Sequence, residues 1–118
     1  MNESDKDKKE KRQLNNMELE IIEEEERTIV NLPERIDTVN AQDFEQSIVS
    51  VLEKSEGEVV YDARNMNYIS SSGLRVMLKS LQTLQSKKVR FSIANMIPSV
   101  KHVFDMTGFS NIIPITSK

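Results

Sequence analysis

One stretch of the sequence organises the rest of the chain: Tyr61-Asp-Ala-Arg-Asn-Met-Asn-Tyr-Ile-Ser-Ser-Ser-Gly-Leu-Arg-Val-Met-Leu-Lys79. Residues 59–61, which lead into it, are valines and a tyrosine, and these residue types favour β-strands. A polar connection follows Asp62 and ends in three consecutive serines. Apolar residues then recur at the spacing of one helix face: Leu74, Met77, Leu78 and Leu81. The stretch therefore predicts a strand, a polar loop and an amphipathic helix.

The three serines at positions 70–72 stand directly before the predicted helix. A serine hydroxyl in this place can accept a hydrogen bond from the free N–H groups of the first helical turn, so the local pattern predicts an N-cap. The same end of a helix also tolerates an anion, because the helix dipole is positive there. A cap and a phosphate-bearing site are both compatible with the local pattern.

The spacing from Asp62 to Ile69-Ser-Ser-Ser-Gly-Leu74 resembles the central signature of the STAS domain, which occurs in anti-sigma factor antagonists and at the cytoplasmic end of sulfate transporters. The stretches Asn95-Met-Ile-Pro-Ser-Val100 and Phe104-Asp-Met-Thr-Gly-Phe109 resemble the C-terminal part of the same domain. The resemblance covers about residues 17 to 116, and the serine loop is its most specific part.

In this family the first serine of the Ser-Ser/Thr/Ala-Gly run is the phosphorylated residue of the antagonists, and it corresponds to Ser71 here. Family members often carry Asp just before that serine, whereas this chain has Ser70. The resemblance therefore implies phosphorylation at Ser71, with Ser70 and Ser72 as adjacent alternatives.

The resemblance also implies a partner-binding surface around the serine loop: Asp37, Ser70, Ser71, Ser72, Gly73, Leu74 and Arg75. Within it we expect Leu74 to offer an apolar anchor and Arg75 a charge at the rim. Gly73, which has no side chain, would let a kinase approach the backbone closely. Asp37 and Asn40 are expected near the loop, although both are also good local candidates for a helix cap.

By resemblance, the unphosphorylated protein binds an anti-sigma factor and so releases a sigma factor for transcription in a bacterial cell. The anti-sigma factor is itself a serine kinase whose phosphorylation of Ser71 reverses the binding, and a PP2C-type phosphatase restores the first state. The alternative is a non-switching STAS scaffold or accessory module of a transporter or signalling complex, which Ser70 in the usual Asp position would fit. A third and weaker hypothesis is nucleotide binding at the serine loop.

Composition narrows the classes of function that the chain can carry. Its 118 residues suffice for one domain with a single core. The absence of cysteine excludes disulfides, thiol catalysis and thiolate metal sites. A serine nucleophile usually needs a histidine beside it, and the single histidine, His102, is predicted to be exposed. We therefore expect no enzyme, no metal site and no cofactor.

Charge and hydropathy narrow the choice of partners. The formal net charge is -3, with acidic and basic residues mixed, and no basic face of the kind that binds nucleic acid stands out. The residues after Met1 lack the apolar region of a signal peptide, and no apolar run approaches the ~20 residues of a membrane span. We expect a cytoplasmic protein that binds other proteins, without nucleic-acid binding or membrane insertion.

Periodicity predicts an α/β fold. Residues 1–16 are charged and nearly devoid of apolar side chains, so we expect a disordered segment there and the STAS domain at 17–118. Strands are expected near 17–22, 28–32, 58–61, 89–94 and 112–115, and helices near 41–54, from the serine loop to about 85, and near 98–107. Repeated strand–helix–strand units imply parallel pairing with right-handed crossovers. Together with the family fold, they indicate a mixed, mostly parallel sheet of four to five strands with helices mainly on one face.

Three local features complete the prediction. The acidic run 23–26 is expected at an exposed turn, because like charges crowd poorly inside a sheet. Gly57 is expected in the left-handed conformation after a helix end. Pro98 and Gly108 are expected at the first position and just past the end of the last helix.

Overall fold

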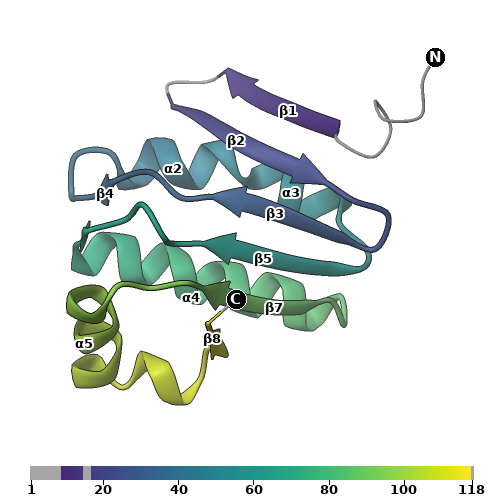
Figure 1. Ribbon diagram of the computed structural model, residues 1–118. Helices are drawn as coiled ribbons and strands as arrows, with labels where there is room; N and C mark the ends of the chain where they lie inside the picture. The colour runs from purple at the N-terminus through teal and green to yellow at the C-terminus, as the bar shows by residue number, and fades with distance from the viewer. Residues whose placement is uncertain (1–8, 15–16, 118) are drawn as a thin grey trace.

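A computed structural model describes the backbone of residues 9–14 and 17–117 and the side chains of residues 17–117. Six strands form one mixed sheet in the order β1-β2-β3-β5-β7-β8 (Figure 1). Their bounds are β1 (Lys9–Leu14), β2 (Glu18–Glu23), β3 (Arg27–Asn31), β5 (Glu58–Asp62), β7 (Arg90–Ala94) and β8 (Ile115–Thr116). The pairs β1–β2 and β2–β3 are antiparallel, whereas β3–β5, β5–β7 and β7–β8 are parallel. The predicted mixed and mostly parallel sheet is confirmed.

The helices of the described chain are α2 (Ala41–Ser47), α3 (Val49–Lys54), α4 (Ser71–Ser86) and α5 (Pro98–Thr107), followed by the 3-10 turn η1 (Phe109–Asn111). Figure 1 shows α2, α3 and α4 together on one face of the sheet, with α5 beside the end at which β5 and β7 finish. As predicted, Pro98 is the first residue of α5, and Gly108 follows it in the left-handed conformation with φ 86°. This arrangement confirms the α/β class and the placing of helices mainly on one face.

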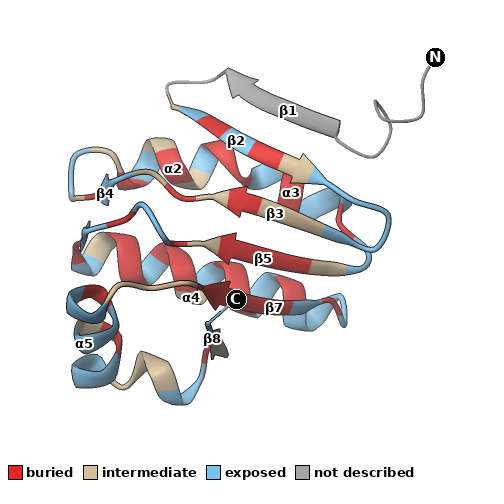
Figure 2. Cartoon of the chain, in the orientation of Figure 1, coloured by how far each residue is buried: buried red, intermediate tan, exposed pale blue. Residues whose placement is uncertain are grey.

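The core lies between the sheet and the helices, and Tyr61 of β5 stands in its middle. Its ring meets Phe91 of β7 edge-on at 4.7 Å and Phe44 of α2 at 6.1 Å between ring centroids. Its hydroxyl shares a hydrogen bond of 2.8 Å with the hydroxyl of Ser80 on α4. Burial raises the pKa of Tyr61, so the phenol stays neutral. The hydrogen bond to Ser80 gives the buried hydroxyl its polar partner. Figure 2 shows buried residues concentrated along β5 and α4, which this tyrosine joins.

The N-terminal segment differs from the prediction of disorder over residues 1–16. Residues 9–14 form β1, which pairs antiparallel with the edge of β2 over the whole strand. A strand edge presents unpaired N–H and C=O groups, and these can order a neighbouring backbone whatever its side chains are. Residues 1–8 and 15–16 lie outside the described part, so the boundary at residue 17 stays a prediction.

The single helix predicted over residues 41–54 is wrong, because α2 and α3 are separate and meet at Ile48. The backbone of Ile48 leaves helical values, with φ -101° and ψ 1°. Directly before it, the buried Ser47 hydroxyl donates to the carbonyls of Asp43 at 2.9 Å and Met17 at 3.0 Å. A serine that bonds to the carbonyl one turn back bends a helix, which accounts for the break.

Gly57 also differs from its prediction, since it is absent from the described residues with positive φ. A Cβ at Gly57 would stand 2.2 Å from the carbonyl oxygen of Glu26. The next N–H, that of Glu58, donates to the same oxygen at 3.0 Å. Glycine is needed there because two backbones approach closely at the turn after β2. The acidic run 23–26 at this turn is exposed, as predicted.

Candidate functional site

The serine loop lies at the end of the sheet where the parallel strands finish. A short parallel ladder, β4 (Arg35–Ile36) with β6 (Tyr68–Ile69), holds the loop directly before the first serine. The N–H of Ser70 donates to the carbonyl of Ile36 at 2.8 Å. The loop is thereby joined to the segment that carries Asp37, which brings two predicted site segments together.

The three serines have different surroundings. Ser70 is buried at the N-cap of α4, and its hydroxyl oxygen accepts a hydrogen bond of 3.1 Å from the N–H of Gly73. Ser71 is the first residue of α4 and is exposed. Ser72 is half-buried. The capping role therefore belongs to Ser70, and Ser71 presents the most accessible of the three hydroxyls.

Gly73 and Leu74 are both buried, and this burial disfavours the surface roles expected for them. A Cβ on Gly73 would stand 2.7 Å from Cγ1 of Ile69 and 2.9 Å from Cγ2 of Ile36. Glycine lets α4 pack directly on the β4–β6 ladder, which is a reason for its presence that involves no kinase. Leu74 belongs to the hydrophobic core, where it is 6% exposed.

Asp37 lies in the tight turn before α2 and is half-buried. Its Oδ1 accepts from the backbone N–H of Asn40 at 2.9 Å and of Val39 at 3.0 Å, and its Oδ2 accepts from Arg35 at 3.1 Å. These partners, with the Asn40 N–H first, lower the pKa of Asp37, so the carboxylate stays charged. Asn40 does not cap α2 through its side chain, whose oxygen instead accepts from the N–H of Asp37 at 2.8 Å.

Arg75 lies one turn into α4 and is exposed. It lines a groove of about 290 Å³ between α2 and α4, together with Thr38, Ala41, Gln42, Glu45, Ser72, Val76 and Lys79. Glu45 and Lys79 form an ion pair of 2.6 Å across this groove. The guanidinium of Arg75 has no hydrogen-bond or ion-pair partner among the described residues. Within residues 17–117, Arg75 is therefore an unpaired positive charge in the groove that Ser72 also lines.

A model of the STAS domain family matches residues 16–118. The chain belongs to the STAS domain family. The predicted membership of this family is thereby confirmed. Over 82 residues the domain is 32% identical to BtrV of Bordetella bronchiseptica, a protein named as an anti-sigma factor antagonist. That alignment covers 70% of this chain and 71% of the relative.

Several solved structures with the same fold carry the name anti-sigma factor antagonist. One from Mycobacterium paratuberculosis matches this STAS domain with a TM-score of 0.77 and 21% identity over 85% of both chains. SpoIIAA, a Bacillus cell fate determinant, matches in its unphosphorylated form with a TM-score of 0.70 and 15% identity over 85% of this chain and 89% of that one. Its phosphorylated form matches with a TM-score of 0.64 and 14% identity over 85% and 92%. The names of these proteins describe regulators and not catalysts.

Two exposed apolar side chains flank the serine loop of the STAS domain and were missed by sequence reasoning. Val39, in the turn before α2, is 86% exposed, and Tyr68 of β6 is 45% exposed. The guanidinium of Arg35 lies 4.7 Å from the centre of the Tyr68 ring. An apolar residue inside a polar connection was the available signal, since Val39 stands between Thr38 and Asn40.

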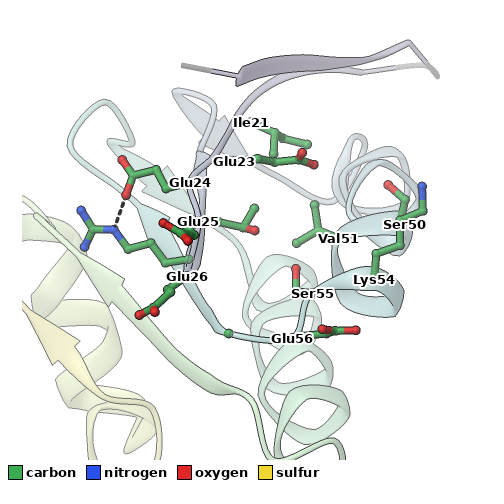
Figure 3. A pocket seen from close by; sticks show the side chains of 13 residues that line it. Ile21, Glu23, Glu24, Glu25, Glu26, Ser50, Val51, Lys54, Ser55 and Glu56 are labelled. Carbon is green, nitrogen blue, oxygen red and sulfur yellow. Dashed lines mark hydrogen bonds and ion pairs between the residues drawn. The ribbon is translucent and has the colours of Figure 1, made fainter. Parts of the chain in front are cut away.

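The opposite end of the sheet carries a hollow of about 440 Å³ beside the turn between β2 and β3. Figure 3 shows its carboxylates and the ion pair of 2.8 Å between Glu24 and Arg27.

Across the described residues, no group of histidine and carboxylate side chains is arranged to hold a metal ion. Within the same residues, every helix is too short or too polar to traverse a lipid bilayer.

Proposed function

We propose that this STAS domain binds an anti-sigma factor in its unmodified state and is released when Ser71 is phosphorylated. The observation that carries the proposal is the division of roles in the loop, where Ser70 is buried as the cap and Ser71 is exposed as the first residue of α4. A kinase can reach an exposed hydroxyl without unwinding the helix. The names of the relatives support the class of partner.

The physical basis of the switch is the different cost of an added anion in the two states. A phosphoserine adds about -1.5 to -2 charges. At the start of α4 the helix dipole favours it by only ~0.3–1 kcal/mol. Burying the same anion against a partner that brings no new cation costs several kcal/mol. The free domain therefore tolerates the phosphate, and the complex does not.

This chain has Ser70 where the family often has Asp, and a serine there is compatible with the same cap at the start of α4. The Ser70 hydroxyl accepts from the N–H of Gly73, and a carboxylate in the same place can accept the same bond. The substitution keeps the cap and leaves Ser71 in the position of the family's phosphorylated serine. Ser70 is buried, which disfavours it as the phosphate acceptor.

The enzymes of the cycle are part of the proposal. An anti-sigma factor with serine kinase activity would add the phosphate to Ser71, and a PP2C-type phosphatase would remove it. Both act in the cytoplasm, where the STAS domain would release a sigma factor. The domain itself would be a binding module and not a catalyst.

The proposal is tested by capturing the anti-sigma factor from native lysate and titrating it calorimetrically against variants. Ser71→Ala should bind as wild type does. Ser71→Asp should bind weaker by a factor on the order of 100, which corresponds to a coupling of about 3 kcal/mol. Gln82→Glu adds a negative charge at an exposed position farther along α4 and should change nothing. Equal affinity of Ser71→Asp and wild type would refute the proposed mechanism.

A further inference from the structure

Ser71 and Arg75 stand one helical turn apart on α4, and both are exposed. Residues four positions apart share a face of a helix, and long side chains lean toward the helix N-terminus. A long side chain at position 75 can therefore reach back over the turn that Ser71 begins. An anion followed by a cation four residues later is the favourable order of such a pair.

The neighbouring charges leave Arg75 available for this contact. The carboxylate of Glu45 on α2 is paired with Lys79, and that of Asp37 is paired with Arg35. Arg75 is the first charged residue of α4, and its guanidinium has no partner among residues 17–117. Within residues 17–117, a phosphate on Ser71 would therefore meet the unpaired guanidinium of Arg75. The carboxylates of Glu45 and Asp37 would not compete for Arg75, because each already has its own cation.

We infer that Arg75 is the internal counter-ion of phosphorylated Ser71, so that modification both adds an anion and removes Arg75 from the surface offered to the partner. The inference rests on the proposed function for its acceptor residue. The guanidinium presents paired N–H groups that match two phosphate oxygens, a geometry that lysine lacks.

This pairing gives the switch a second component. In the unmodified domain Arg75 is free to meet an acidic group of the anti-sigma factor. After phosphorylation the same guanidinium is neutralised within the domain, and the partner loses a favourable charge at the moment when it meets an unfavourable one. The two effects act in the same direction on binding.

The test uses the whole chain with phosphoserine incorporated at position 71 during translation, which needs no kinase. The second ionisation of the phosphate is followed by phosphorus NMR in wild type, Arg75→Gln, Arg75→Lys and Lys54→Gln. A phosphoserine has a second pKa of about 6, and a cation in contact lowers it. We expect wild type to titrate roughly half a unit to one unit lower than Arg75→Gln. Arg75→Lys should lie between the two. Lys54→Gln removes an exposed cation on α3, leaves the Glu45–Lys79 pair intact and should match wild type.

The same proteins give a second readout in thermal unfolding. Phosphorylation should raise Tm more in wild type than in Arg75→Gln, because only wild type gains the pair. Equal phosphate pKa values in wild type and Arg75→Gln would overturn the inference whatever the phosphate does in cells. A Ser71 that is never phosphorylated in cells would instead overturn the proposed function, so the two failures are distinguishable.

Discussion

The hydroxyl of Ser70 accepts a hydrogen bond of 3.1 Å from the backbone N–H of Gly73. This bond fixes the first turn of α4 and decides which of three identical residues is the cap. Ser70 is held inward by it, and Ser71, one residue further, is exposed. The accessible acceptor is thus a consequence of how the helix begins.

Loss of the cap is predicted to destabilise the domain. Ser70→Ala leaves the N–H of Gly73 without its acceptor and should lower the free energy of unfolding by about 1 kcal/mol. Ser70→Asp restores an acceptor and should stay close to wild type. Urea denaturation measures both, with the exposed Ser71→Ala as a control that should change stability little. A stable Ser70→Ala would show that the bond is not needed.

Gly73→Ala is predicted to be more harmful than replacement of Gly108, the glycine that follows α5. The added methyl would meet Ile69 and Ile36 at distances below 3 Å, and overpacking of this kind costs ~1–3 kcal/mol. Gly108→Ala is the matched control, because its Cβ has open space and only the positive φ opposes it. Its cost should be about 1 kcal/mol. Thermal unfolding of the two variants should rank them in this order, and the reverse order would contradict the packing described.

The charged carboxylate of Asp62 is predicted to add to the free energy of unfolding, and this contribution is predicted to disappear in acid. Burial alone would raise its pKa, but the Arg64 N–H, the Asn95 side chain and the Arg64 guanidinium together lower it. A carboxyl whose pKa is lower in the folded state stabilises the fold above its unfolded pKa of about 3.9, and this contribution is lost as pH falls below that value.

Asp62→Asn should therefore be less stable than wild type at pH 7, by about 1 kcal/mol for the lost charge-assisted bonds. The difference should shrink as pH falls through about 4 toward 3. Urea denaturation of both proteins at the two ends of this range measures it. A difference that is the same at pH 7 and pH 3 would show that the charge of Asp62 is not responsible.

Tyr68 is predicted to serve partner binding and not folding. It is half exposed beside the serine loop, so Tyr68→Ala should change Tm little while weakening binding to the anti-sigma factor by about 2 kcal/mol. Val49→Ala is the matched control, since Val49 is also partly exposed but lies at the start of α3. Similar affinities of the two variants would remove Tyr68 from the interface.

Sequence periodicity predicted the helices and strands that have an apolar face repeating at regular spacing. Leu74, Met77 and Leu81 place α4 because a helix must direct these residues to one side, and all three are buried. The β4–β6 ladder was not predicted, since two-residue strands contain no period. At the break before Ile48 the Ser47 hydroxyl bonds to Asp43, one turn back, and also to the distant Met17, and no local pattern contains the second bond.

The sequence predicted that the serine loop is the site, but it could not predict which of the three serines is the buried cap and which is exposed. Ser70, Ser71 and Ser72 are chemically identical, and only the carbonyl of Ile36 and the packing of Gly73 decide which one is buried. For the same reason Leu74, which begins the apolar face of α4, was assigned to the surface although it belongs to the core.

Phosphosite mapping by mass spectrometry, on the protein isolated from its own cells in growth and under stress, tests the central claim most directly. Trypsin cuts after Arg64 and Arg75 and releases one peptide that contains Ser70, Ser71 and Ser72. Fragmentation along the backbone then assigns the phosphate to one of the three. The account predicts phosphate on Ser71 in one condition and its absence in the other. Phosphate confined to Ser70 or Ser72, or an unmodified peptide in every condition, would contradict it.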